Sequence, residues 1–249
     1  MSDYLQEYFC WFESYVKGFF TEEEVFNRSI AFKRDHSLRV CDEMRYLCGE
    51  LSLDRESVFI AETIALFHDI GRFEQFASYG TYCDKKSINH SWLGREILHS
   101  KQILGAFNPE QQDIIETAVE LHGARELPPA LSGRALFFTQ LIRDADKLDI
   151  MYIVTENPDG IPMDMGLSDA AVCSEPVVEA ILTGEQADYR EMKTWNDLRL
   201  IHMSWVNDMN FPVSLKRIKS RQYLEKLAGQ LPDTPVVRQI KSRIFAFLN

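Results

Sequence analysis

Apolar residues recur at helical spacing through most of the chain, and no long stretch alternates with the period of two that is typical of a strand. Between Phe32 and Leu47, apolar residues and His36 follow one helical face. The run IAETIALFHDIGRF predicts a nearly all-apolar helix that ends in His68-Asp69. A helix this apolar belongs in a core, so the pattern predicts an all-α fold.

Capping residues divide the chain into helices. Asp54, Asn108-Pro109 and Ser87 are placed as N-terminal caps, and Thr21 precedes three glutamates that favour a helix start. We expect residues 72–86 to form a loop. We expect helices over residues 4–20, 22–50, 55–68, 88–101, 109–122 and 132–154, with about four more in the C-terminal region.

The segment ENPDGIP, residues 156–162, is the longest obvious loop. It divides the predicted helical core with its N-terminal helix, residues 1–155, from a C-terminal helical extension, residues 156–249. We expect the extension to pack on the core as one compact unit. Its aromatic residues favour a helical face for a homodimer.

Composition narrows the class of protein. The 249 residues carry a net charge of -11, which disfavours binding to nucleic-acid backbones and anionic membranes. No apolar run approaches the roughly 20 residues needed to cross a bilayer, and MSDYLQEYF is unlike a secretory signal. The five cysteines include no CxxC pair. A reduced cytoplasmic protein is the expectation.

Adjacent ionisable residues at the end of a core helix need a reason to be there, and a bound metal is a common one. The other candidate ligands lie about one helical hairpin apart, so neighbouring helices can bring them together. We expect one metal at His36, His68, Asp69 and Asp146, and a second at His90 and His122 with Asp69 bridging. Imidazole and carboxylate select Fe, Mn, Co, Ni or Zn, and Mg less readily, so the cofactor is one or two divalent metals.

Other interpretations of these residues stay open. The ligand set can instead be a buried hydrogen-bonded network, with His90 and His122 as a core histidine and a helix-terminal histidine. Asp144 and Asp149 are alternatives to Asp146. Asp144 is off the apolar face, whereas Asp149 lies one turn further along it and is better suited to support a ligand.

The order of these ligands resembles the HD superfamily of metal-dependent phosphohydrolases. The resemblance covers about residues 25–155 and rests on His36, on HDIGR and on ADKLD. His90 and His122 match the additional histidines of members that bind two metals. The longer string HDIGRFEQF is similar to a bacterial subgroup. The resemblance implies a bundle of at least five helices with the metal site at its centre.

Several cations are candidates for contact with a phosphorylated substrate. Arg72 follows the HDIG turn, Lys86 precedes the helix of His90, and Arg125 follows His122. Lys147 neighbours Asp146 and is a candidate catalytic residue alongside Asp69 and Arg72. Salt bridges and solvated loop positions are the simpler interpretations of these cations.

Three functions fit the pattern. The first is a metal-dependent phosphohydrolase that uses metal-activated water on a nucleotide or another small phosphoester or phosphoanhydride. The alternative is a mixed-valent diiron oxygenase of the inositol-oxygenase-like type, because the same ligand string occurs in that branch. The third is a regulatory module with a vestigial metal site, which the complete ligand set disfavours.

Overall fold

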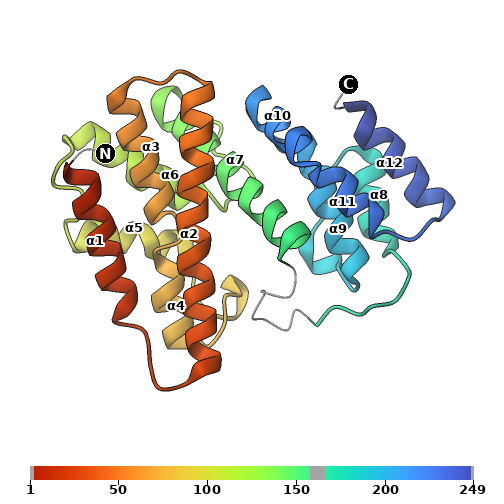
Figure 1. Ribbon diagram of the computed structural model, residues 1–249, viewed down its shortest axis with the longest axis horizontal. Coiled ribbons are helices and arrows are strands. Elements are labelled where there is room, and N and C mark those ends of the chain that lie inside the picture. Colours follow the sequence, from red (N-terminus) through yellow and green to blue (C-terminus); the bar gives the residue numbers. More distant parts are fainter. Residues whose placement is uncertain (1–2, 158–165, 248–249) are drawn as a thin grey trace. The chain divides into compact units, whose positions relative to one another are not determined.

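The computed structural model describes residues 3–157 and 166–247, and within these ranges the chain is helical without a β-strand (Figure 1). An isolated bridge joins Ser168 and Thr194. The all-α prediction is confirmed. The predicted loop at 156–162 lies largely outside the described residues.

The chain forms two compact units, Met1–Asp149 and Ile150–Asn249. The division falls inside helix α7 (Gly133–Glu156) rather than in the loop that follows it. The packing of residues 156–249 on the core stays a prediction. Besides most of α7, the first unit contains α1 (Asp3–Lys17), α2 (Glu24–Glu50), α3 (Arg55–Phe67), α4 (Gly71–Tyr79), the 3-10 turn η1 (Asp84–Lys86), α5 (His90–Ser100) and α6 (Pro109–Leu121).

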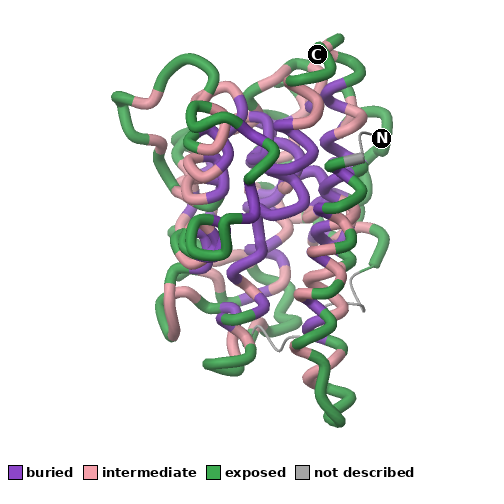
Figure 2. The backbone as a smooth tube through the Cα atoms, turned by 90° about the vertical axis from the view of Figure 1, so that its left-hand side faces the viewer, coloured by how far each residue is buried: buried purple, intermediate pink, exposed green. Residues whose placement is uncertain are grey.

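Helix α3 is the centre of the first unit and packs against α1, α2 and α6. It begins as predicted at Asp54, whose side chain accepts a hydrogen bond from the backbone N–H of Ser57. Every residue from Ile60 to Phe67 is buried. Figure 2 shows buried segments inside this unit flanked by exposed ones. Because α3 is enclosed on several sides, its C-terminal end delivers His68 and Asp69 into the protein interior.

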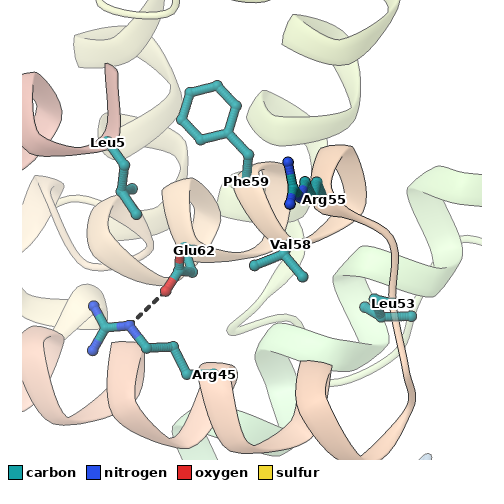
Figure 3. Close-up of a pocket in the computed structure, with 7 residues that line it drawn as sticks. All are labelled: Leu5, Arg45, Leu53, Arg55, Val58, Phe59 and Glu62. Atoms are coloured by element: carbon teal, nitrogen blue, oxygen red, sulfur yellow. Dashed lines mark hydrogen bonds and ion pairs between the residues drawn. The ribbon is translucent and has the colours of Figure 1, made fainter. Parts of the chain in front are cut away.

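One buried carboxylate in α3 faces away from that end. Glu62 is 7% exposed and forms an ion pair with Arg45 of α2. The pair lines a cavity of about 700 Å³ beside Leu5, Leu53 and Phe59 (Figure 3). The ion pair compensates the charge that burial of Glu62 would otherwise leave unpaired.

The predicted loop at 72–86 is wrong in its first half, because residues 71–79 form helix α4. A glycine after an apolar helix is suited to the C-terminal turn of that helix, but Gly71 starts α4, where it crosses the first turn of α5. A Cβ at Gly71 would lie 2.2 Å from the carbonyl oxygen of His90 and 2.7 Å from the amide nitrogen of Gly94. The two backbones approach so closely that only glycine fits.

Two further capping predictions are wrong and one is confirmed. The cap of α5 is Asn89, which accepts from the N–H of Trp92, so the helix begins later than a Ser87 cap would give. The residue before α2 is Glu23, while the Thr21 hydroxyl accepts from its N–H. Asn108 caps α6 in a full capping box with Pro109 in the first turn.

The second unit is organised around α9 (Trp195–Ser204), which packs against α8 and α11. Its other elements are α8 (Glu175–Thr183), η3 (Tyr189–Glu191), η4 (Trp205–Asp208), α10 (Pro212–Arg221), α11 (Tyr223–Gly229) and α12 (Pro235–Phe247). Among the described residues of both units, none of the helices combines the length and apolarity that a bilayer span requires.

Asp197, in the first turn of α9, connects three stretches of the second unit. Its carboxylate accepts from the N–H groups of Ser174, Lys193 and Thr194 and from the Ser174 hydroxyl, at 2.6–3.0 Å. Burial raises the pKa of Asp197, but these donors outweigh it, so its pKa is lowered overall. The ionised carboxylate is therefore the form that the folded unit stabilises.

We predict that Gly71→Ala destabilises the protein by about 3 kcal/mol, the upper end for overpacking, because the new Cβ meets backbone that cannot move aside. Gly49→Ala is the matched control, since a Cβ there meets nothing within 4 Å and α2 should gain up to about 1 kcal/mol. Urea denaturation measures both. Equal stabilities of the two variants would contradict the close α4–α5 contact.

We predict that Asp197→Asn costs about 2 kcal/mol at neutral pH, because buried donors lose their charged acceptor. Since folding lowers the pKa of Asp197, its contribution is present at neutral pH and is lost as the pH falls through the lowered value. Thermal melting should show the stabilities of the variant and the natural protein differing at pH 7 and converging only below pH 3.8, the ordinary pKa of an aspartate. Asp233→Asn, an exposed surface acid, is the control.

Candidate metal centre

Five helices bring the predicted ligands together inside the first unit. His36 lies in the middle of α2, and His68 and Asp69 follow the C-terminal end of α3. His90 is the first residue of α5, and His122 stands at the C-terminal end of α6. Asp146 lies in the third turn from the end of α7. The four histidines and Asp69 are at most 5% exposed. The Asp146 side chain is 20% exposed and is the most accessible of the set.

The first half of the cluster is formed by His36, His68 and Asp146. The Nε2 atom of His36 lies 3.1 Å from Oδ1 of Asp146 and 3.3 Å from Nε2 of His68. Oδ2 of Asp69 is 3.6 Å from the same His36 nitrogen. One ligand atom from each of His36, His68 and Asp146 lies within 4.8 Å of the others, a separation that suits a shared metal ion.

The second half is formed by His90 and His122, whose Nε2 atoms are 3.2 Å apart. The other oxygen of Asp69, Oδ1, lies 3.4 Å from Nε2 of His90 and 3.6 Å from Nε2 of His122. The carboxylate of Asp69 therefore stands between the two halves, with one oxygen toward each. His68, Asp69 and His122 form a second group with the spacing of a metal site.

All four imidazoles present the same nitrogen to the centre. Nδ1 of His68 donates to the carbonyl oxygen of Ala65 at 2.8 Å, and Nδ1 of His122 donates to that of Val119 at 2.7 Å. A carbonyl oxygen only accepts, so each Nδ1 carries the hydrogen and the neutral ring leaves a lone pair on Nε2.

The other two histidines are oriented by carboxylates. Nδ1 of His36 is 2.6 Å from Asp149, and Nδ1 of His90 is 2.8 Å from Asp84. A carboxylate that accepts from Nδ1 also directs the Nε2 lone pair toward the centre. The sequence interpretation placed Asp149 in this supporting position.

The electrostatics favour neutral rings at two of these positions. Burial lowers the pKa of His68 to about 3 and the pKa of His90 to about 4, so both are neutral and able to bind a metal at neutral pH. Burial also lowers the pKa of His36, but hydrogen bonds to Asp146 and Asp149 outweigh it and its pKa is raised overall. Positive charge beside Asp146 is therefore favourable.

Lys33 and Arg72 contact Asp69 directly, and Lys33 was missed from the sequence. Lys33, one helical turn before His36, places Nζ 2.7 Å from Oδ2 of Asp69. Nε of Arg72 lies 3.3 Å from Oδ1. Burial raises the pKa of Asp69, but Lys33, His68 and Arg72 lower it, and the net result is a pKa well below the usual range. The position of Lys33 three residues before His36 was the available signal.

The cations predicted to contact a substrate differ in how far they are exposed and in how many protein groups they bind. Arg72 is mostly engaged within the protein, since Nη1 donates to Gln75, to the Tyr82 carbonyl and to Asp84. Lys86 is exposed at the end of η1, and Arg125 is exposed after α6. Lys147 is 8% exposed in α7. Their roles toward a substrate stay predictions.

The residues fit a metal better than a closed hydrogen-bonded network. The Nε2 atoms of four imidazoles and the oxygens of two carboxylates face one another. Lys33 and Arg72 donate to Asp69, and the Ser91 hydroxyl lies 3.0 Å from Nε2 of His90. Even so, Nε2 of His90 and Nε2 of His122 face each other at 3.2 Å as two acceptor atoms. A bound cation satisfies them together.

Residues 34–151 match the family model of the HD domain, which covers all six predicted ligands. No curated protein matches the chain, and no solved structure matches it. HD domains bind divalent metals and are mostly metal-dependent hydrolases of the phosphohydrolase type, and the His/Asp cluster is compatible with such a metal. The helical bundle, the cluster at its centre and the matched region agree, and residues 34–151 form an HD domain.

Proposed function

We propose that the protein is a phosphohydrolase that acts on a nucleotide or another small phosphoester or phosphoanhydride and depends on one or two divalent transition metals. One observation carries the proposal. Four imidazoles that are oriented through Nδ1 converge by Nε2 on two carboxylates, and Asp69 stands between the halves.

We assign one metal to His36, His68, Asp146 and Oδ2 of Asp69, and the other to His90, His122 and Oδ1 of Asp69. When bound, such cations lower the pKa of water and neutralise charge on a phosphoryl group. Iron, manganese, cobalt, nickel and zinc suit this donor set, and magnesium suits it less well.

The residues around the centre supply the remaining requirements. Lys33 and Arg72 place positive charge beside Asp69, which favours the approach of a phosphoryl group despite the net charge of -11. In the hydrolysis, water gives up a proton to solvent and its oxygen bonds to phosphorus, while the ester P–O bond breaks and the leaving oxygen takes a proton. Lys147 is our candidate donor for that proton.

The substrate must enter where the centre is least covered. Asp146 is the most exposed of the proposed ligands. Lys86 and Arg125 lie in exposed segments that adjoin the helices of His90 and His122, and we assign them to the outer phosphates of a nucleotide. A cytoplasmic location and a homodimer are part of the same proposal.

We predict that the protein, loaded with Mn²⁺, Co²⁺ or Ni²⁺, hydrolyses a chromogenic phosphoester, and that a chelator abolishes this activity until metal is returned. Asp69→Asn should reduce kcat/KM at least about a thousandfold, because both halves lose their shared carboxylate. Circular dichroism verifies the fold of the variant, and Asp146→Asn replaces it should it unfold. Asp233→Asn, an exposed acid, should leave the rate unchanged.

Elemental analysis of protein purified without chelator distinguishes the phosphohydrolase from the alternatives. Two tightly bound irons with substrate-dependent oxygen uptake, and no phosphoester cleavage, would favour the diiron oxygenase. Protein that binds no transition metal under any loading condition would contradict both enzymes.

A further inference from the structure

The four histidines of the cluster are oriented in two different ways. His68 and His122 each donate to a carbonyl of their own helix, three residues earlier in the chain. These contacts use acceptors of the same helix and need no residue from another element. His36 and His90 instead depend on carboxylates from other elements, Asp149 and Asp84. Each half of the cluster therefore contains one histidine whose orientation depends on a specific aspartate.

The support of His36 is built from two long helices. Asp149 lies in α7, is 2% exposed and accepts from Nδ1 of His36 at 2.6 Å. Arg39, one turn after His36 in α2, donates Nε to the other oxygen of Asp149 at 2.7 Å. Both residues that support His36 lie in long helices, Arg39 in α2 and Asp149 in α7. Helix α7 also carries the proposed ligand Asp146.

The support of His90 is different because it stands on a short segment. Asp84 lies in the three-residue turn η1, and its side chain is 34% exposed. Its carboxylate is 2.8 Å and 2.9 Å from Nδ1 of His90. Two side chains of α4 hold it there. Nη1 of Arg72 donates at 2.9 Å, and Nε2 of Gln75 donates at 2.8 Å.

The same two side chains also fix the backbone around Asp84. Gln75 is fully buried and donates further to the Ser87 hydroxyl and to the Ile88 carbonyl. Arg72 donates to the Tyr82 carbonyl and to Asp69 itself. The orientation of His90 is thus connected through Asp84 and Arg72 to the carboxylate that both halves share.

The two halves also differ in the number of ligands. The half around His36 has His36, His68, Asp146 and one oxygen of Asp69, whereas the half around His90 has His90, His122 and the other oxygen of Asp69. With fewer protein ligands, the second half depends more strongly on the exact direction of each ring.

We propose that Asp84 is a positioning residue that aims Nε2 of His90 and so controls the second cation position, while Asp149 does the same for the first. The inference rests on the proposed metal-dependent function. Partners of this kind change metal affinity by about 10–100-fold when removed. Asp84→Asn keeps the shape of the side chain but removes its charge, and its amide group faces the donors of Arg72 and Gln75.

The test is a calorimetric titration of metal-free protein with Mn²⁺, joined to electron paramagnetic resonance of the loaded protein. The natural protein should bind two ions and give the signal of a coupled pair. Asp84→Asn should weaken the second ion by about 10–100-fold and give a single-ion signal while the first affinity is unchanged. Asp149→Asn should weaken the tighter ion instead. Asp233→Asn is the matched exposed control.

Asp84→Glu separates charge from general structure, because it keeps the carboxylate. It should retain more affinity for the second ion than Asp84→Asn does, and it also serves as the measured variant if Asp84→Asn fails to fold. If Asp84→Asn leaves both Mn²⁺ affinities unchanged, the inference about Asp84 is wrong. It is also wrong if Asp84→Asn and Asp149→Asn each weaken both cation positions equally. Neither outcome would contradict the proposed function. A natural protein that binds no Mn²⁺ would overturn the proposed function as well.

Discussion

The structure depends on the compensation of one buried carboxylate, Asp69. A charge in the protein interior is costly unless it is paired and hydrogen-bonded, and a single partner would not satisfy both oxygens. Lys33 and Arg72 approach it from two sides, and the imidazoles of both halves of the cluster surround it. Five helices must begin, end or pass at this point for these groups to meet. The packing of the bundle therefore sets the distances between the groups at its centre.

Helix ends provide much of the orientation that the cluster needs. The last carbonyl groups of a helix lack a partner within it. His68 and His122 stand at the ends of α3 and α6, and each donates Nδ1 to one of these carbonyls. A single contact therefore completes the helix end and directs Nε2 toward the centre. Gly71 adds the close approach of α4 and α5 that brings His90 beside Asp69.

The overall charge and the local charge of the protein act in opposite directions. The acidic surface, with a net charge of -11, disfavours polyanionic partners such as nucleic acid. Near Asp69, however, Lys33 and Arg72 supply positive charge, and a metal would add more. The substrate that we propose, a small phosphorylated molecule, suits this combination because a small anion meets less of the acidic surface than a polyanion does.

The sequence alone determined the all-α class, the caps at Asp54 and Asn108 and the six residues that meet at the centre, because periodicity, capping and ligand type are local properties. It did not reveal helix α4, since Gly71 reads locally as a stop and acts only through its contact with α5. The tertiary structure alone decided the contact of Lys33 with Asp69, the support of His90 by Asp84 and the division of the cluster by the two oxygens of Asp69. Each of these is a distance between residues far apart in the chain or on different elements, and only the packing of the helices sets such distances.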